Sequence, residues 1–173
     1  ILVAYNLHIQ KKIEAFNNIN QKIGNLSVLQ DFMKVAGEED SVEAKLNKIN
    51  EIVIEKYDIK YSTIVVFDGA EYVIKATNVD KLHHETLTNL HNEEIFQDSV
   101  ATATPKYITI ENENEKLPYQ KVEMGRAKSA MFFPLYTDNI FMGYWIMESG
   151  KMHAFDKVDT TIIEVVKENI ISV

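Results

Sequence analysis

The chain has 173 residues, a length that suits one domain with an added helical arm, and 46% of its residues are apolar, enough for a sizeable core. Its formal net charge of −8 argues against a broad nucleic-acid or anionic-membrane surface, because both need clustered cations. The absence of cysteine excludes disulfides, thiolate nucleophiles and cysteine-bound metals, and it fits a cytoplasmic location.

The longest apolar runs are residues 129–136 and 140–147, which are only of strand length, so we expect no membrane-spanning segment. No signal peptide is recognisable at the start of the chain. The chain begins at Ile1 without a methionine and ends at Val173 within a helical pattern. We therefore expect it to be part of a longer protein.

Apolar residues recur at heptad spacing over residues 2–33. Two apolar positions in every seven predict a coiled-coil helix, and Gly37 offers its end because glycine readily adopts the left-handed cap conformation. We therefore expect an N-terminal coiled-coil signalling helix over residues 1–36 and a globular domain over residues 37–173. The two heptad series are Leu2, Ile9, Phe16 and Ile23, and Tyr5, Ile19, Leu26 and Met33, the second interrupted by Lys12.

A second helix is predicted to follow. Asp40 and Glu43 have the spacing of a capping box, in which each side chain satisfies a backbone N–H of the first helical turn. The helix should end near Tyr57. Its buried face is expected to consist of Val42, Leu46, Ile49 and Val53.

The middle of the sequence predicts a β-hairpin, a polar helical region and a further strand. β-Branched and aromatic residues indicate the strands, Asp68-Gly69 indicates the hairpin turn, and Pro105 ends the last helix. A charged loop long enough to suggest a functional segment comes next. The expected ranges are strands 61–67 and 71–78, helical sequence 80–97, a short helix 98–104, strand 107–111 and loop 112–128.

The last third of the sequence predicts a second hairpin, with strands 129–136 and 140–149 around a turn at 137–139. A final helix begins at the capping residue Asp156. Antiparallel hairpins with helices at both ends of the chain describe an α+β domain, in which the end helices cover one sheet face and the middle helices and loop cover the other. The wide apolar face of the final helix is formed by Val158, Ile162, Val165, Val166, Ile170 and Val173.

This order of elements and the amino-acid sequence of residues 129–163 resemble the GAF domain family. The likeness extends over roughly residues 26–173. The family commonly shows an apolar strand ending in Pro-Leu, an apolar strand containing glycine, and then a phenylalanine and aspartates that open the last helix. A further match is Ser99-Val100-Ala101-Thr102, which resembles the short helix that lies beside the ligand in the family. The residues in the first set of positions are Pro134, Leu135, Gly143, Phe155, Asp156 and Asp159.

The resemblance implies a GAF-like antiparallel sheet and a regulatory sensor that binds a small molecule. Occupancy would be transmitted through the terminal helices to an output domain, such as a diguanylate cyclase or a histidine kinase, while the fragment itself is no enzyme. Cyclic-nucleotide-binding relatives carry an Asn-Lys…Phe-x-x-x-Asp-Glu signature. Phe155 and Asp159 fit it, Thr160 replaces its glutamate, and the Asn-Lys pair has no counterpart. Cyclic AMP or cyclic GMP therefore stays one option, and no covalent cofactor is expected because the bilin-tethering and reductase cysteines are absent.

Residues in the last strand should alternate between the sheet faces. Tyr144 and Glu148 would share one face if Trp145 and Met147 pack on the terminal helices. A carboxylate on the ligand side would accept hydrogen bonds from a purine amine. The alternative is that Glu148 lies at the strand exit in solvent.

Four further residues would lie beside one ligand pocket: two end the second predicted strand, where relatives contact their ligand, and one belongs to the short helix that flanks the pocket. Phe96 would stack on a base, while the others offer neutral hydrogen-bonding groups. For each residue there is a simpler alternative: a turn-forming asparagine, a core phenylalanine or an ordinary helix threonine. The four candidates are Thr77, Asn78, Phe96 and Thr102.

Arg126 is the only arginine of this acidic chain, and a guanidinium binds phosphate or carboxylate through two hydrogen bonds. The alternative is a solvated loop cation. His83, His84 and His91 invite a metal interpretation, but the zinc-protease pattern would need histidine at Thr88. We therefore predict no metal site, and no catalytic constellation is recognisable.

Two functions from different classes remain. The first is the ligand-binding sensor, which would have a small molecule and a second copy of the chain as partners. The second is a structural dimerisation module that has a filled pocket and binds no ligand. In both cases the terminal helices would form the homodimer.

The heptad pattern predicts a parallel dimer. Replacing Ile9, Phe16 and Ile23 by aspartate should give a folded monomer, because charges would lie at buried seam positions. Sedimentation velocity measures the change. An unmodified protein that sediments as a monomer at about tens of micromolar, a scale typical of moderate association, would contradict the prediction.

Overall fold

The computed structural model describes residues 3, 4, 6, 9, 41–57, 59–112, 114–119 and 127–155. The first four of these are helical. The rest of the predicted coiled-coil seam, its end at Gly37 and the final helix from Asp156 lie outside the described residues. No helix within the described part is long and apolar enough to cross a membrane.

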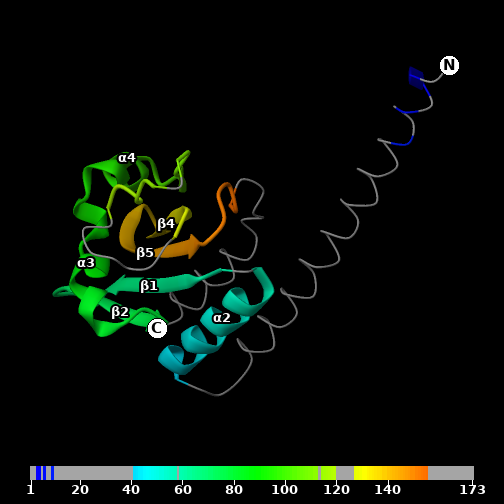
Figure 1. Ribbon diagram of the computed structural model, residues 1–173. Helices are drawn as coiled ribbons and strands as arrows, with labels where there is room; N and C mark the ends of the chain where they lie inside the picture. The colour runs from blue at the N-terminus through cyan, green and yellow to red at the C-terminus, as the bar shows by residue number, and fades with distance from the viewer. Residues whose placement is uncertain are drawn as a thin grey trace.

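Five antiparallel strands form one sheet, in the order β2-β1-β5-β4-β3 (Figure 1). Two hairpins, β1–β2 and β4–β5, are joined along β1 and β5, which are neighbours in the sheet although about 80 residues separate them along the chain. The predicted strand positions are largely confirmed. The strands are β1 (Tyr61–Phe67), β2 (Tyr72–Thr77), β3 (Lys106–Thr109), β4 (Ser129–Thr137) and β5 (Ile140–Ser149).

The helices cover opposite faces of the sheet. In Figure 1, α2 (cyan) lies against β1 and β2 on one side, and α3 and α4 (green) lie apart from it. The predicted α+β architecture is thus confirmed for the described elements, which form an open antiparallel sheet with helices. The helical elements are α2 (Val42–Tyr57), η1 (Lys81–His83), α3 (His84–Thr88), η2 (Leu90–Asn92) and α4 (Glu94–Thr102).

The start of α2 differs from the sequence-based expectation. Ser41, not Asp40, is the capping residue: its Oγ accepts a hydrogen bond from the backbone N–H of Ala44 at 3.2 Å. The helix therefore begins one residue later than predicted, at Val42, and position 44 offers no side chain that could complete a capping box. Its end at Tyr57 and its burial of Leu46, Ile49 and Val53 are confirmed.

The helix after the middle region is longer than predicted. α4 begins at Glu94 rather than Asp98: Glu93 before it is extended, and Phe96 in its first turn is buried. Ala103 ends the helix in the left-handed conformation, two residues before Pro105. The following strand β3 starts one residue early and ends at Thr109, whose partner Ser129 is the first residue of β4.

Both hairpin turns have the conformations that their residues favour. The Asp68 carboxylate accepts hydrogen bonds from the backbone N–H groups of Ala70 and Glu71, each at 2.9 Å. Asp138 and Asn139 adopt positive φ angles of 49° and 64°, as in the two-residue turns that match the twist of a hairpin. The turn chemistry predicted at both positions is confirmed.

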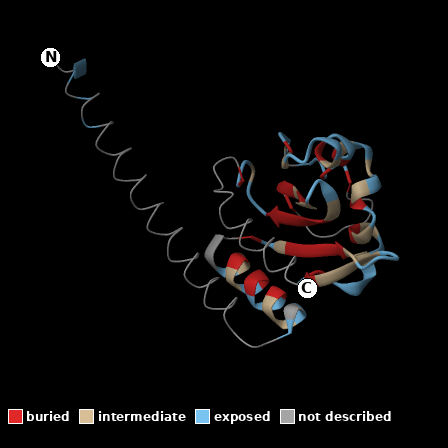
Figure 2. Cartoon of the chain, turned by 180° about the vertical axis from the view of Figure 1, so that it is seen from behind, coloured by how far each residue is buried: buried red, intermediate tan, exposed pale blue. Residues whose placement is uncertain are grey.

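Each face of the sheet has its own apolar core, and buried residues line the strands and one side of α2 (Figure 2). The α2-side core contains Trp145, Met147 and Phe155, so this phenylalanine of the GAF-like motif is a core residue. The opposite core, beneath α3, α4 and the β3–β4 loop, contains Val65, Leu87, Leu90, Ile110, Leu117, Ala130, Ile146 and an aromatic group described below.

Gly143 permits the central strands to approach. It pairs with Val66 of β1 and Leu135 of β4, and its φ is +148°. A Cβ at this position would lie 2.0 Å from the carbonyl oxygen of Val65 and 2.9 Å from the Cα of Val66. Both atoms belong to the backbone, so the strands would have to separate to admit any other residue.

Gly143→Ala should lower the free energy of unfolding by about 3 kcal/mol or more, from backbone strain and overpacking together. Gly150→Ala is the matched control, because a Cβ there meets nothing within 4 Å. Urea denaturation monitored by circular dichroism measures both. Equal stabilities of the two variants would contradict the steric argument.

Candidate functional site

The predicted alternation of β5 is confirmed. Trp145 and Met147 pack in the core beneath α2, while Tyr144 and Ile146 belong to the opposite core. Glu148 follows the same alternation, because its side chain contacts Tyr119 of the opposite core. Tyr144, Ile146 and Glu148 therefore lie on the same face of β5, beneath α3, α4 and the β3–β4 loop.

Glu148 is buried. Its side chain and backbone are only 1% exposed, so the alternative of a carboxylate in solvent is wrong. Its Oε1 accepts a hydrogen bond from the hydroxyl of Tyr119, and its backbone carbonyl accepts one from the N–H of Lys60 at 2.8 Å. A buried carboxylate needs such donors, because an ionised group without them is costly in an apolar interior.

Tyr119 is a site residue that the sequence-based prediction missed. It comes from the β3–β4 loop and is fully buried. Burial and the adjacent Glu148 charge raise the pKa of the Tyr119 phenol well above its usual value, so the hydroxyl stays protonated and donates to the carboxylate. The available signal was the pair Leu117 and Tyr119, two apolar residues within an otherwise charged stretch.

Phe96 lies in a stack of aromatic rings. Its ring is 4.3 Å from that of Phe132 with an interplanar angle of 15°, and 5.3 Å from that of Tyr119. Phe132 continues the stack to Tyr144 at 5.0 Å. All four rings are fully buried, so in this conformation their faces contact protein and no space for a ligand.

Tyr144 bridges the sheet and the helices above it. Its hydroxyl donates to the carbonyl of Leu87 and accepts from the N–H of Leu90 at 3.2 Å. Burial raises the pKa of Tyr144 far above its usual range. This side chain therefore holds the segment between α3 and η2 onto β5.

Thr77 and Asn78 lie at the end of β2, where their polar groups bind the backbone and a neighbouring strand. The Thr77 hydroxyl is 2.7 Å from that of Thr63 and accepts from the N–H of Val79 at 3.0 Å. The Asn78 side chain accepts from the N–H of Ser62 at 2.9 Å and donates to the carbonyl of Lys60 at 2.8 Å. Asn78 thus fastens the start of β1.

Thr102 is not brought to this site. Thr102 is exposed at the end of α4, where its hydroxyl donates to the carbonyl of Asp98 at 2.8 Å and lies 2.6 Å from that of Thr104. Arg126 lies outside the described residues. Its two possible roles, anion binding or a solvated loop cation, both stay predictions.

The histidines of the middle region are placed separately. The Nε2 of His84 is 3.0 Å from the carbonyl oxygen of Val79, and the ring of His91 lies 4.0 Å from that of Tyr72. Burial lowers the pKa of His91. Among the residues that the structure describes, no three acidic or histidine side chains are positioned to hold a metal ion.

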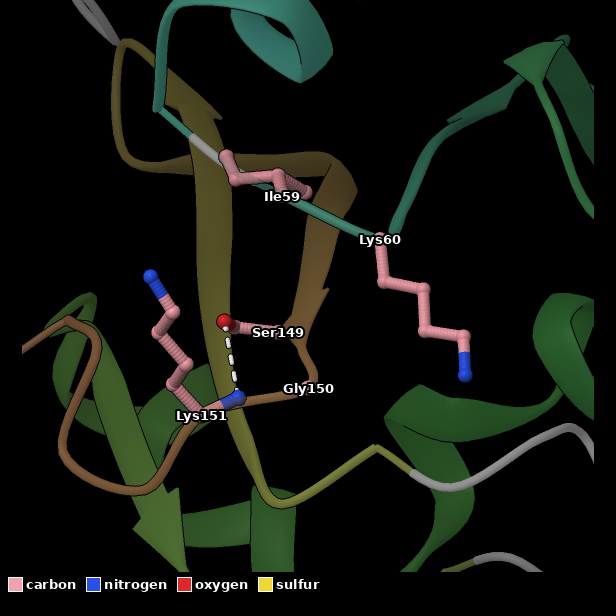
Figure 3. A pocket seen from close by; sticks show the side chains of 5 residues that line it. All are labelled: Ile59, Lys60, Ser149, Gly150 and Lys151. Carbon is pink, nitrogen blue, oxygen red and sulfur yellow. Dashed lines mark hydrogen bonds between the residues drawn. The ribbon is translucent and has the colours of Figure 1, made fainter.

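A surface pocket of about 340 Å³ lies where β5 ends and β1 begins (Figure 3). Ser149 accepts a hydrogen bond from the N–H of Lys151 at 3.2 Å, and the side chains of Lys60 and Lys151 point away from one another. The diverging lysines form no joint anion site. The residues that line this surface pocket are Ile59, Lys60, Ser149, Gly150 and Lys151.

No protein-family model and no curated protein matches the sequence. Solved structures do match the fold. The GAF domain of a phosphoenolpyruvate-protein phosphotransferase from Coxiella burnetii is 13% identical, with a TM-score of 0.67, and the match covers 87% of this chain and 94% of that one. A protein described as a GAF sensor from Burkholderia vietnamiensis is 15% identical, with a TM-score of 0.62 and coverages of 86% and 91%.

A third match is an enzyme. The free methionine-R-sulfoxide reductase from Neisseria meningitidis, solved in complex with its substrate, is 13% identical, with a TM-score of 0.54 and coverages of 84% and 86%. GAF domains recur among the similar structures. The resemblance stated from the sequence is confirmed at the level of the fold: the chain has the GAF fold.

Tyr144→Phe should lower the free energy of unfolding by on the order of 3 kcal/mol, because it leaves the buried Leu87 carbonyl and Leu90 N–H without this hydroxyl. Tyr136→Phe is the matched control. It also removes a hydroxyl that donates to a carbonyl, that of Val100, but at a half-buried position. Urea denaturation should show the larger loss for Tyr144→Phe, and the reverse order would contradict the bridging role.

Proposed function

We propose that this chain is a regulatory sensor domain that binds a cyclic purine nucleotide, cyclic AMP or cyclic GMP, between its sheet and the α3–α4 side. Ligand occupancy would pass through the terminal helices to an output domain such as a diguanylate cyclase or a histidine kinase. The observation that carries the proposal is the buried Glu148 carboxylate, which shares a core with the aromatic stack in a GAF fold.

The chemistry of these groups suits a purine. An aromatic face stacks on the base, and a carboxylate accepts from an exocyclic amine or ring N–H. A cyclic monophosphate carries a single negative charge, which suits an acidic chain whose only arginine, Arg126, would bind it. Adenine and guanine should therefore be preferred to hypoxanthine, which has no exocyclic amine.

Binding requires a rearrangement of the buried site. Phe96, Tyr144 and Glu148 contact no solvent-sized space in the structure, so a ligand reaches them only after a covering side chain moves. Thr77 and Asn78 contribute by holding the start of β1 rather than by direct contact. The proposed contact residues are accordingly Phe96 and Glu148, with Arg126 at the phosphate.

One buried residue connects the site to α2. Ser62 of β1 accepts from the Asn50 amide of α2 at 2.9 Å and from the Trp145 indole at 2.7 Å, while its N–H donates to Asn78. A shift of β1 relative to β2 or β5 would therefore change the packing of α2. This is the route by which occupancy would bias the terminal helices and a homodimer formed through them.

A second function has its own support. The fully buried aromatic rings are those of a filled core, which is what a structural dimerisation module without ligand needs. Thiol-based reduction, as a function shared with the sulfoxide reductase, is excluded because the chain has no cysteine. We propose no enzymatic activity for this fragment.

Calorimetric titration of cyclic AMP and cyclic GMP into the purified chain tests the sensor. Glu148→Ala should weaken binding about ten- to a hundredfold, because one charged hydrogen bond is lost. Arg126→Ala should weaken it through the lost phosphate contact, and Glu71→Ala, which removes an exposed carboxylate in the β1–β2 turn, should have no effect.

If neither nucleotide binds below about millimolar, the scale at which affinity is no longer informative, the nucleotide assignment is wrong. A stable dimer with no bound small molecule would then favour the structural module. If a nucleotide binds and both site variants behave like the unmodified chain, the ligand class stands and the proposed contacts are wrong.

A further inference from the structure

The β3–β4 loop sends two side chains into the interior. Leu117 and Tyr119 are almost completely buried, whereas Pro118 between them and the three residues before Leu117 are exposed. Tyr119 is therefore a loop residue whose ring has been inserted among side chains of the sheet and α4. Leu117 and Tyr119 therefore anchor a loop whose neighbouring residues are exposed to solvent.

The inserted ring satisfies both groups that the proposed ligand would use. Its ring lies beside that of Phe96, with 5.3 Å between centroids and an interplanar angle of 50°, and its hydroxyl donates to the Glu148 carboxylate. A purine with an exocyclic amine offers the same two features, a planar ring and a hydrogen-bond donor at its edge. The tyrosine side chain thus reproduces the recognition chemistry of a base within the protein interior.

The insertion also satisfies Glu148 and fills space beside Phe96. A buried carboxylate without a donor is strongly unfavourable, and a void beside Phe96 would forfeit packing. The raised pKa of the Tyr119 phenol keeps the donor protonated across the physiological range. Tyr119 therefore supplies a protonated donor to Glu148 and fills the space beside Phe96.

We infer that Tyr119 is an internal ligand: its phenol occupies the proposed ligand site, and an external ligand must displace it from Phe96 and Glu148. The site then selects a planar ring that carries a hydrogen-bond donor, and binding expels the Tyr119 side chain. This inference rests on the proposed sensor function for its biological meaning. Its physical content, a site shaped for a phenol, stands separately.

The first experiment replaces the side chain by its free equivalent. Tyr119→Ala should bind p-cresol in a calorimetric titration, whereas the unmodified chain should not, because its own phenol fills the site. Toluene, which has the same ring without the hydroxyl, should bind Tyr119→Ala at least about tenfold more weakly, since it offers Glu148 no donor. Tyr107→Ala is the matched control, because that tyrosine is 42% exposed, and it should bind neither compound.

A folded Tyr119→Ala that binds neither compound, or binds both equally, overturns the inference. If circular dichroism shows that the variant does not fold alone, p-cresol and toluene are titrated into it. Recovery of the folded spectrum with p-cresol at a concentration at least about tenfold below that needed with toluene supports the inference. No recovery with either compound overturns it.

A second titration separates this inference from the nucleotide assignment. Cyclic AMP and cyclic GMP are added to the unmodified chain and to Tyr119→Ala, and any nucleotide that binds should bind the variant at least about tenfold more tightly, because the competing phenol is gone. Equal affinities overturn the internal ligand and leave the sensor proposal intact. Binding of p-cresol to the variant with no nucleotide binding to either protein supports the internal ligand and removes the nucleotide.

Discussion

The pairing of β1 with β5 at the centre of the sheet is the constraint on which the rest of the structure depends. It joins two local hairpins into one sheet, and Gly143 permits it by leaving room for the Val65 carbonyl. The resulting register sets Tyr61 opposite Glu148 and Ile64 opposite Trp145. A slip of one residue would exchange the two faces of β5 and move the carboxylate to the α2 side.

The two sheet faces carry different chemistry. On the α2 side the buried Ser62 receives hydrogen bonds from Asn50 of α2 and Trp145 of β5, beside a core of apolar side chains. On the other side aromatic rings stack in sequence and end at a buried carboxylate. β1 contributes residues to both faces. Because close-packed interiors transmit small displacements, a packing change at one face would shift residues at the other.

Burial changes the meaning of the candidate site. Groups that recognise a ligand in an open pocket would be exposed in its absence, but here Phe96 and Glu148 are already satisfied by protein groups. A ligand must therefore compete with internal contacts, and its apparent affinity is reduced by the fraction of molecules that present the open site. The same contacts are also those of a filled structural core.

Local patterns in the sequence determined the elements in which buried residues recur at the period of a strand or a helix. β1, β5, the two turns, the buried face of α2 and the alternation of Tyr144 and Glu148 about Trp145 follow from periods of two and 3.6 and from turn chemistry. The cap at Ser41 and the start of α4 at Glu94 were misplaced, because several neighbouring residues serve equally well until packing selects one. Only the tertiary structure placed Tyr119 on Glu148 and Asn78 on Ser62, since these contacts join residues 29 and 16 positions apart and no local period encodes which loop side chain satisfies a buried group.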